Sequence, residues 1–174
     1  LVRDAGYLSR HEKTQNVGRW SHHNYRDGNI DKYVLAAEEL AFRGYYVLRM
    51  GINVLKPLKS PNPKIIDYAN SEIRSHFMDI YLGAKCYFCI SSQGGFDAIP
   101  IIFRRPVAII EVPIGLFFTS SEKILLLTKH LINKLSKKEL TISEIFSSNV
   151  GIAQHSKEYE DNNVEILENS PEEI

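Results

Sequence analysis

Short apolar runs alternate with segments of helical spacing between Val2 and Ile110, and no other feature of the sequence constrains the fold as strongly. Apolar residues recur at helical spacing from Ile30 to Ala41 and again from Ile73 to Tyr81. Strands are predicted around these segments at 45–48, 65–66, 86–90 and 107–110. Because strand and helix take turns, we predict an α/β fold with a parallel sheet, formed by residues 1–174 as a single domain.

Capping residues predict where the helices begin and end. Asn29 is expected to cap the first helix and Gly44 to end it, while Ser71 and Gly83 bound the second. Pro100 is expected near the first turn of a short third helix at 96–103, where its missing N–H costs least. Weaker patterns after Glu111 predict a strand at 125–127, a short helix at 142–146 and a strand at 164–167.

Composition narrows the class of partner. The chain has 174 residues, 44% of them hydrophobic, which is enough for a buried core. Lys+Arg and Asp+Glu number 21 each, so no general attraction to nucleic acid or to an anionic membrane is expected. No apolar run approaches the length that crosses a bilayer, and no signal peptide is recognisable. We therefore expect a cytoplasmic protein with a small-molecule partner.

Cys86 and Cys89 have the spacing of a redox or zinc motif. In the strand predicted at 86–90, however, this odd separation sends the two thiols to opposite faces. The six histidines add no second cluster at ligand spacing. We therefore predict that both cysteines are packing residues and that the chain has no metal site.

Both ends of the sequence have the pattern of interrupted elements. Leu1 and Val2 are typical of the end of a strand. Ser170 followed by Pro171 and two glutamates is typical of the start of a helix. We therefore expect a larger protein on both sides of this segment.

Polar residues and glycines directly follow the predicted strands. Ligands of open parallel sheets bind beyond the carboxyl ends of the strands, and right-handed crossovers bring these ends to one edge. The residues that follow the strands in chain order are Arg3, Asp4, Arg49, Gly51, Asp67, Ser91, Ser92, Gly94, Gly95 and Glu111. Two arginines, hydroxyls, glycines and carboxylates at one edge predict a site for an anion and a sugar.

The glycine turn is the part of this set best suited to phosphate. Gly94 and Gly95 let the backbone approach a ligand, and the hydroxyls of Ser91 and Ser92 add donors. Arg49 can close a bidentate contact on a phosphate group. Each residue also has a structural interpretation, because glycines serve turn geometry and an arginine can pair with a neighbouring acid.

Five stretches of the chain, strongest from Tyr25 to Pro106, carry a resemblance to a known family. They are "VRDAGYL", "YRDGNIDKYVLAAEELAFRGYYVLRMG", "IIDYANSEIRSHFMDIYLGAKCYFCISS", "GGFDAIPIIFRRPV" and "VEILENSPEEI". In this order they resemble a family of bacterial glycosyltransferases linked with surface-polysaccharide synthesis. The chain looks like the donor-binding C-terminal half of a two-domain GT-B-type transferase, in which the acceptor domain precedes it.

The resemblance implies a Rossmann-like sheet and two substrates, a nucleotide-sugar donor and a glycan or lipid-linked acceptor. Peripheral association with a membrane is compatible with a lipid-linked acceptor. Members of this class usually need no metal, and no cofactor is expected. By position, the resemblance places Arg49, Ser91, Ser92, Gly94 and Gly95 around the donor phosphates. It places Arg3, Asp4, Tyr25, Arg26 and Asp67 along the same cleft.

Catalysis would need a general base for the acceptor hydroxyl, and Asp4 is the candidate within this chain. The structural alternative is that Asp4 pairs with Arg3 or Arg26 and holds the loop. Two other functions stay open: a nucleotide-sugar epimerase or hydrolase, and a non-catalytic module that binds nucleotide or glycan. The family motif has a histidine where this chain has Leu1, which keeps the non-catalytic alternative open.

Overall fold

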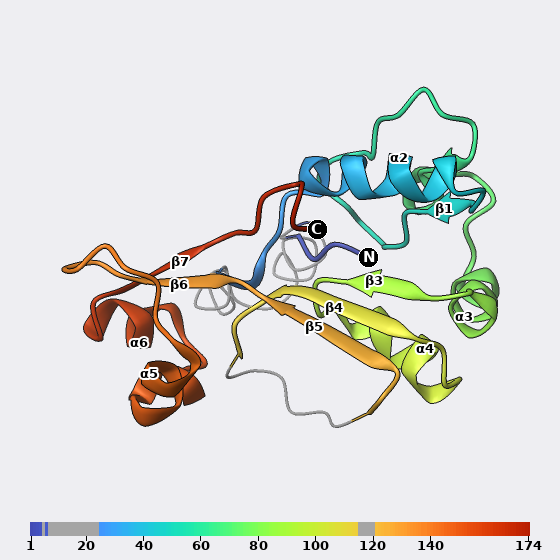
Figure 1. Ribbon diagram of the computed structural model, residues 1–174. Helices are drawn as coiled ribbons and strands as arrows, with labels where there is room; N and C mark the ends of the chain where they lie inside the picture. Colours follow the sequence, from blue (N-terminus) through green and yellow to red (C-terminus); the bar gives the residue numbers. More distant parts are fainter. Residues whose placement is uncertain (5, 7–24, 115–120) are drawn as a thin grey trace.

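The computed structural model describes residues 1–4, 6, 25–114 and 121–174. Short helices flank small β-sheets in these residues, so the predicted α/β class is confirmed (Figure 1). The strands form three separate hydrogen-bonded sheets of two, three and two strands, where the sequence predicted one. Two of the three sheets are parallel, as predicted, and the third is antiparallel.

The first sheet pairs β1 (Val47–Leu48) in parallel with β2 (Ile65–Ile66). The helix that packs on it begins as the 3-10 turn η2 (Ile30–Tyr33) and continues as α2 (Val34–Phe42). Asn29 caps this helix as predicted, because its side chain accepts a hydrogen bond from the Asp31 amide. Gly44 follows the helix at a φ of 99°, in the left-handed region that glycine tolerates, so its predicted role is also confirmed.

The second sheet consists of β3 (Cys89–Ser91), β4 (Val107–Val112) and β5 (Ile124–Thr128), all parallel. The 3-10 turn η4 (Gly95–Asp97) and helix α4 (Ala98–Ile102) connect β3 to β4. The first residues of the chain run beside the other edge of β3. There the Leu1 amino group donates to the Ile90 carbonyl at 2.7 Å, and the Ser92 amide donates to the Leu1 carbonyl at 3.0 Å. This is the bonding pattern of a parallel strand.

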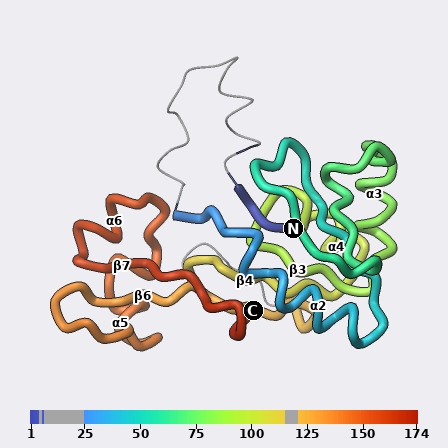
Figure 2. Tube along the Cα trace, turned by 90° about the horizontal axis from the view of Figure 1, so that it is seen from above, coloured from blue at the N-terminus to red at the C-terminus, as the bar shows by residue number. Residues whose placement is uncertain are grey.

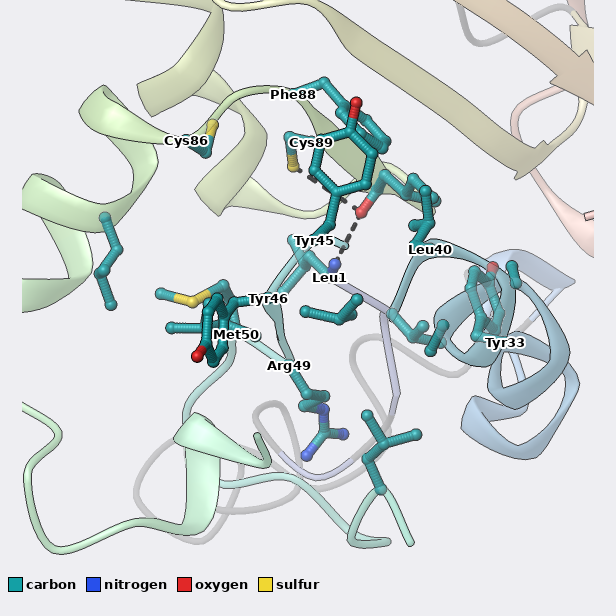
Figure 3. Close-up of a pocket in the computed structure, with 18 of the residues that line it drawn as sticks. Leu1, Tyr33, Leu40, Tyr45, Tyr46, Arg49, Met50, Cys86, Phe88 and Cys89 are labelled. Atoms are coloured by element: carbon teal, nitrogen blue, oxygen red, sulfur yellow. Dashed lines mark hydrogen bonds between the residues drawn. The ribbon is translucent and has the colours of Figure 1, made fainter. Parts of the chain in front are cut away.

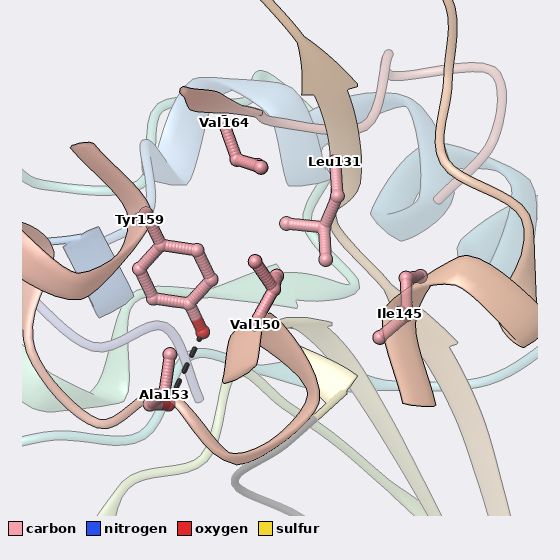
Figure 4. Packing of buried hydrophobic residues seen from close by; sticks show 6 residues of the cluster. All are labelled: Leu131, Ile145, Val150, Ala153, Tyr159 and Val164. Atoms are coloured by element: carbon pink, nitrogen blue, oxygen red, sulfur yellow. Dashed lines mark hydrogen bonds between the residues drawn. The ribbon is translucent and has the colours of Figure 1, made fainter. Parts of the chain in front are cut away.

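The third sheet pairs β6 (His130–Asn133) antiparallel with β7 (Val164–Leu167), and neither the direction nor β6 was predicted. Helix α5 (Ile142–Ser147), the turn η6 (Asn149–Ile152) and helix α6 (Ser156–Asp161) pack on this sheet. We call residues 130–167 the C-terminal lobe. Figure 4 shows its core, which consists of Leu131, Ile145, Val150, Ala153, Tyr159 and Val164. The Tyr159 hydroxyl donates to the Ala153 carbonyl at 3.2 Å within this core.

Helix α3 (His76–Lys85) differs from the prediction at both ends. Ser75 caps it, whereas the Ser71 hydroxyl donates to the Tyr68 carbonyl and closes the 3-10 turn η3 (Tyr68–Asn70). The helix also continues past Gly83 and ends at Lys85, so Cys86 lies outside the strand that was predicted for it. The apolar residues that predicted a buried helix face are exposed to solvent: Ile73, Phe77, Ile80 and Tyr81.

Figure 2 shows the C-terminal lobe on one side, helices α2, α3 and α4 on the other, and the chain ends between them. The predicted helix start at Ser170 is seen as one turn, in which the Glu173 and Ile174 amides donate to the Ser170 carbonyl. Among the residues that the structure describes, no helix is both long and apolar enough to cross a membrane.

Candidate functional site

Arg49 follows β1 directly, and only 3% of its surface is exposed. Because β1 pairs in parallel with β2, Asp67 at the end of β2 lies beside it, with Oδ1 3.5 Å from Nη1. On the other side, Nη2 lies 3.5 Å from Asp4 Oδ2. Among the described residues, none of the three guanidinium nitrogens has a hydrogen-bond partner. Burial lowers the pKa of Arg49, and the charges of Asp67 and Asp4 oppose this shift.

Asp4 also organises the backbone around it. Its Oδ1 accepts a hydrogen bond from the Gly6 amide at 2.8 Å, and its Oδ2 accepts one from the Leu55 amide at 3.2 Å. This matches the structural alternative for Asp4, a carboxylate that holds a loop, although the charged partner is Arg49 instead of Arg3 or Arg26.

Asp67 has a similar double role. Its Oδ2 accepts from the Leu58 amide at 3.2 Å and from Asn70 Nδ2 at 2.7 Å. Its Oδ1, which faces Arg49, has no hydrogen-bond partner among the described residues. Each acid therefore anchors a turn and is a charge neighbour of the guanidinium, which has no hydrogen bond within the usual geometry among the described residues.

Ser91 and Ser92 lie at the end of β3, and both are fully buried. The Ser91 hydroxyl donates to Asp97 Oδ2 at 3.1 Å. The Ser92 hydroxyl accepts a hydrogen bond from the Arg3 amide at 2.6 Å. Burial raises the pKa of Asp97, and the hydrogen bond from Ser91 opposes this shift. The two hydroxyls thus tie the end of β3 to η4 and to the first residues of the chain.

The glycines at this edge differ in the space around them. A Cβ on Gly94 would lie 2.6 Å from Leu1 Cδ2, so this glycine permits the close approach of the N-terminal segment. A Cβ on Gly95 would meet nothing within 4 Å, so the backbone there is open to a ligand. Gly51 has a φ of 150°, and its carbonyl accepts a hydrogen bond from Arg74 Nε at 3.1 Å.

Arg3 and Arg26 lie close to the turn that contains Gly94. Arg3 forms an ion pair with Asp27, and Arg26 Nη2 donates to the backbone and side-chain oxygens of Gln93, both at 3.4 Å. Burial lowers the pKa of Arg26, and the nearby charge of Arg3 lowers it further. The Arg26 guanidinium therefore lies beside the glycine turn, whereas the Arg3 guanidinium pairs with Asp27.

Tyr25 precedes Arg26 in the chain and lies against the C-terminal lobe. Its hydroxyl donates to the Gln154 carbonyl at 2.6 Å, and its ring packs on Tyr159 with centroids 5.5 Å apart. Burial raises the pKa of Tyr25. Its placement on a donor cleft, which the family resemblance implies, stays a prediction.

Glu111 belongs to a second buried cluster, and it lies inside β4 at a bulge with a φ of 61° instead of following the strand. Lys129, which sequence reasoning missed, lies between β5 and β6 with Nζ 3.8 Å from Glu111 Oε2. The ammonium group also donates to the carbonyls of Tyr25 at 3.0 Å and Asp27 at 3.1 Å. Burial raises the pKa of Glu111 and lowers that of Lys129, while each group's charge opposes the other's shift.

A mostly apolar cavity of about 340 Å³ lies between β1 and β3. Figure 3 shows Arg49 at its edge, with the guanidinium directed away from Tyr45, Phe88 and Cys89. The cavity therefore adjoins the charged edge but does not contain its polar groups. Among the described residues, no group of three or more His, Cys, Asp or Glu side chains is placed to hold a metal ion.

The structure thus brings together part of the set that the sequence indicated. One contact group consists of Arg49, Asp4 and Asp67. Arg3, which precedes Asp4 in the chain, donates its amide to the buried Ser92 hydroxyl. Tyr25 and Glu111 belong to the neighbouring cluster around Lys129. No family model matches the chain, and neither the curated proteins nor the solved structures contain a significant match to it.

Proposed function

We propose that this chain is the nucleotide-sugar-binding unit of a metal-independent, GT-B-type glycosyltransferase of bacterial surface-polysaccharide synthesis. The observation that carries the proposal is Arg49, a guanidinium buried at the carboxyl ends of two parallel strands without a hydrogen-bond partner among the described residues. A buried donor of this kind is costly unless a ligand satisfies it, and a diphosphate offers the bidentate acceptor that guanidinium prefers.

The order of the strands supports a Rossmann-like sheet. The segment from Leu1 to Arg3 pairs with β3, and Leu1 and Val2 also line the cavity next to β1. The sheets are separate, but counting the N-terminal segment as a strand between β1 and β3 gives the order β2, β1, N-terminal segment, β3, β4, β5. In chain order this is the doubly wound pattern 3-2-1-4-5-6. In such sheets ligands bind where the order reverses. That point lies between the N-terminal segment and β3, where Arg3, Ser92 and Gly94 meet.

In the proposed reaction, the bond between the anomeric carbon of the sugar and the diphosphate breaks while the acceptor oxygen bonds to that carbon. Arg49 and the open backbone at Gly95 stabilise the negative charge that develops on the leaving nucleotide. The leaving group takes no proton, and the acceptor proton passes to a carboxylate, for which Asp4 is the candidate. Asp4 then gives up its contact with Arg49 when the donor binds.

The test is a calorimetric titration of the protein with UDP, GDP, ADP, CMP and dTDP without added metal. Saturable binding of one nucleotide is expected, and Arg49→Ala should weaken it more than about tenfold, or about 1.4 kcal/mol. Arg43→Ala is the matched control, because Arg43 is exposed and, among the described residues, its side chain hydrogen-bonds only to Glu39 on the same helix turn. Circular dichroism checks that each variant folds. If no nucleotide binds to the folded protein, the proposal fails.

One observation favours a second candidate, a module that binds a nucleotide or glycan without turning it over. Asp4 already accepts two backbone hydrogen bonds, as a structural carboxylate would. Asp4→Asn separates the two functions: a transferase should keep donor binding and lose turnover, whereas a structural Asp4 makes the variant lose binding or stability. Released free sugar or an epimer without acceptor would instead identify a hydrolase or epimerase.

A further inference from the structure

The amino ends of β3, β4 and β5 lie at one edge of the second sheet, opposite the edge at which Ser91 and Ser92 lie. The register pairs Cys89 with Val107 and Val107 with Ile124, so the three parallel strands begin at the same level. The residues that precede the strands therefore come together there, beside α3 and α4 (Figure 1). We call this edge the amino edge, and it consists of residues 85–88, 101–106 and 121–123.

Four basic side chains gather at the amino edge: Lys85, Arg104, Arg105 and Lys123. Arg105 Nε donates to the Ala84 carbonyl at 2.7 Å, and Lys123 Nζ donates to the Arg104 carbonyl at 3.4 Å, so these residues tie the three segments together. In the part of the chain that the structure describes, none of the four charges forms an ion pair with a carboxylate. Like charges gathered at one edge repel one another, and a bound anion offsets this repulsion.

A hollow of about 390 Å³ lies at this edge. It is lined by Ile101, Arg104, Arg105, Ser121, Glu122, Lys123 and Ile124. The backbone turns from α4 into β4 at Arg104, whose φ of 55° is uncommon for a residue other than glycine. Three cations and a hydroxyl thus surround the hollow together with the carboxylate of Glu122, and this lining suits a phosphate group.

Apolar side chains project into solvent next to the hollow. Ile102 is 73% exposed and Phe103 is 52% exposed, and in the chain they lie between Ile101 and Arg104, which line the hollow. Tyr87, two residues before β3, is 74% exposed at the same edge. A surface that joins basic groups to exposed apolar side chains can bind an anionic bilayer in two ways at once, by attraction to headgroups and by burial of apolar area.

We propose that the amino edge binds the surface of an anionic phospholipid bilayer. A headgroup phosphate occupies the hollow between Arg104 and Lys123, and Ile102 and Phe103 reach the boundary of the acyl chains. A free phosphate ion fits the observations less well, because it leaves both apolar side chains in water. Basic and acidic residues number 21 each in the whole chain, so the attraction is local to this edge. The inference stands independently of nucleotide binding, which concerns the carboxyl ends of the strands.

The experiment is co-sedimentation of the protein with phosphatidylcholine vesicles, with and without about 30% phosphatidylglycerol. The test variants are Phe103→Ser and Arg104→Asn, because asparagine tolerates the left-handed backbone at this position. Phe42→Ser and Arg43→Asn are the matched controls, because Phe42 and Arg43 are also an exposed neighbouring pair but lie at the end of α2. Circular dichroism checks that each variant folds. Calorimetric titration with inorganic phosphate and sedimentation equilibrium are run on the same proteins.

The protein should bind vesicles that contain phosphatidylglycerol at least about tenfold more tightly than vesicles of phosphatidylcholine alone. Arg104→Asn and Phe103→Ser should each weaken this binding about fivefold, whereas Phe42→Ser and Arg43→Asn should leave it unchanged. Equal affinity for the two kinds of vesicle, or equal losses in the test and control variants, would overturn the inference.

Two further outcomes would contradict the bilayer as the partner. Binding of inorganic phosphate that Arg104→Asn removes, without binding to either kind of vesicle, would assign the hollow to a free phosphate. A dimer that Phe103→Ser dissociates, in a protein that does not bind vesicles, would assign the exposed apolar side chains to a second copy of the chain.

Discussion

Arg49 and Lys129 are both buried basic side chains between acidic partners, but their hydrogen bonding differs. The Lys129 ammonium donates to two backbone carbonyls and lies 3.8 Å from Glu111 and 4.0 Å from Glu168. The Arg49 guanidinium lies 3.5 Å from each of two carboxylates and, among the described residues, makes no hydrogen bond. Burial lowers the pKa of both groups.

The difference shows that charge pairing alone does not separate a structural cation from a ligand-binding one. Lys129 fastens the loop at Tyr25 and Asp27 to the junction of β5 and β6, and its donors are used in doing so. Arg49 lies at a strand end, and its donors have no hydrogen-bond partner in the part of the chain that the structure describes. Their effects on stability and on binding should therefore differ, and three changes to basic side chains test this.

The largest effect is expected for Lys129→Met. It leaves Glu111 buried without its charge partner and frees the two carbonyls, so the free energy of unfolding should fall by about 3–5 kcal/mol. Urea denaturation followed by circular dichroism measures this loss. Lys56→Met is the control, because the exposed Lys56–Asp31 pair should contribute less than about 1 kcal/mol. Equal costs for the two variants would show that Lys129 is not the structural cation described above.

Arg49→Met should cost less stability, about 1–3 kcal/mol, because the side chain loses no hydrogen bond to any residue that the structure describes. The side chains of Asp4 and Asp67, which are 18% and 17% exposed, also keep their backbone donors and can take up water. The same urea titration compares Arg49→Met with Lys129→Met. A cost for Arg49→Met that equals or exceeds that of Lys129→Met would make Arg49 a structural cation as well.

His130 extends the comparison to a basic side chain near the surface, where the smallest effect is expected. The hydrogen bond to Glu139, with a further contribution from Glu173, raises the pKa of His130 above its ordinary value of 6.5. The stabilisation is therefore full below the unfolded pKa and is lost as pH rises through the folded pKa. The expected loss between about pH 5.5 and about pH 9 is under about 1 kcal/mol. His130→Asn should remove this part of the pH dependence, and an unchanged pH profile in the variant would contradict the assignment.

Local signals predicted much of the fold because they act within a few residues. Asn29 caps its helix through an amide two positions away, and Gly44 supplies the left-handed backbone at the helix end. The meeting of Arg49 with Asp67 also follows from local signals, because two adjacent parallel strands end at the same level. These features needed no knowledge of distant packing.

Other features depend on side-chain partners that residue type alone does not indicate. Ser71 and Ser75 are equally good caps by residue type, and the bond from Ser71 to the Tyr68 carbonyl decides between them. Lys129 interrupts an apolar run, and its pairing with Glu111 appears only when β5 packs beside β4. Sequence analysis also indicated the hydroxyls of Ser91 and Ser92 as donors to a ligand. It did not indicate that their hydrogen-bond partners are Asp97 and the Arg3 amide, which belong to the chain itself.

The C-terminal lobe has a further consequence for how the chain folds. Its core residues run from Leu131 to Val164, so the loops that must close to assemble it are short. The core cluster that joins Val2 to Ile110 draws on residues from both ends of a much longer stretch. Since closing a longer loop costs more chain entropy, the lobe meets a smaller entropic barrier to assembly than the parallel sheet on which the proposed site depends.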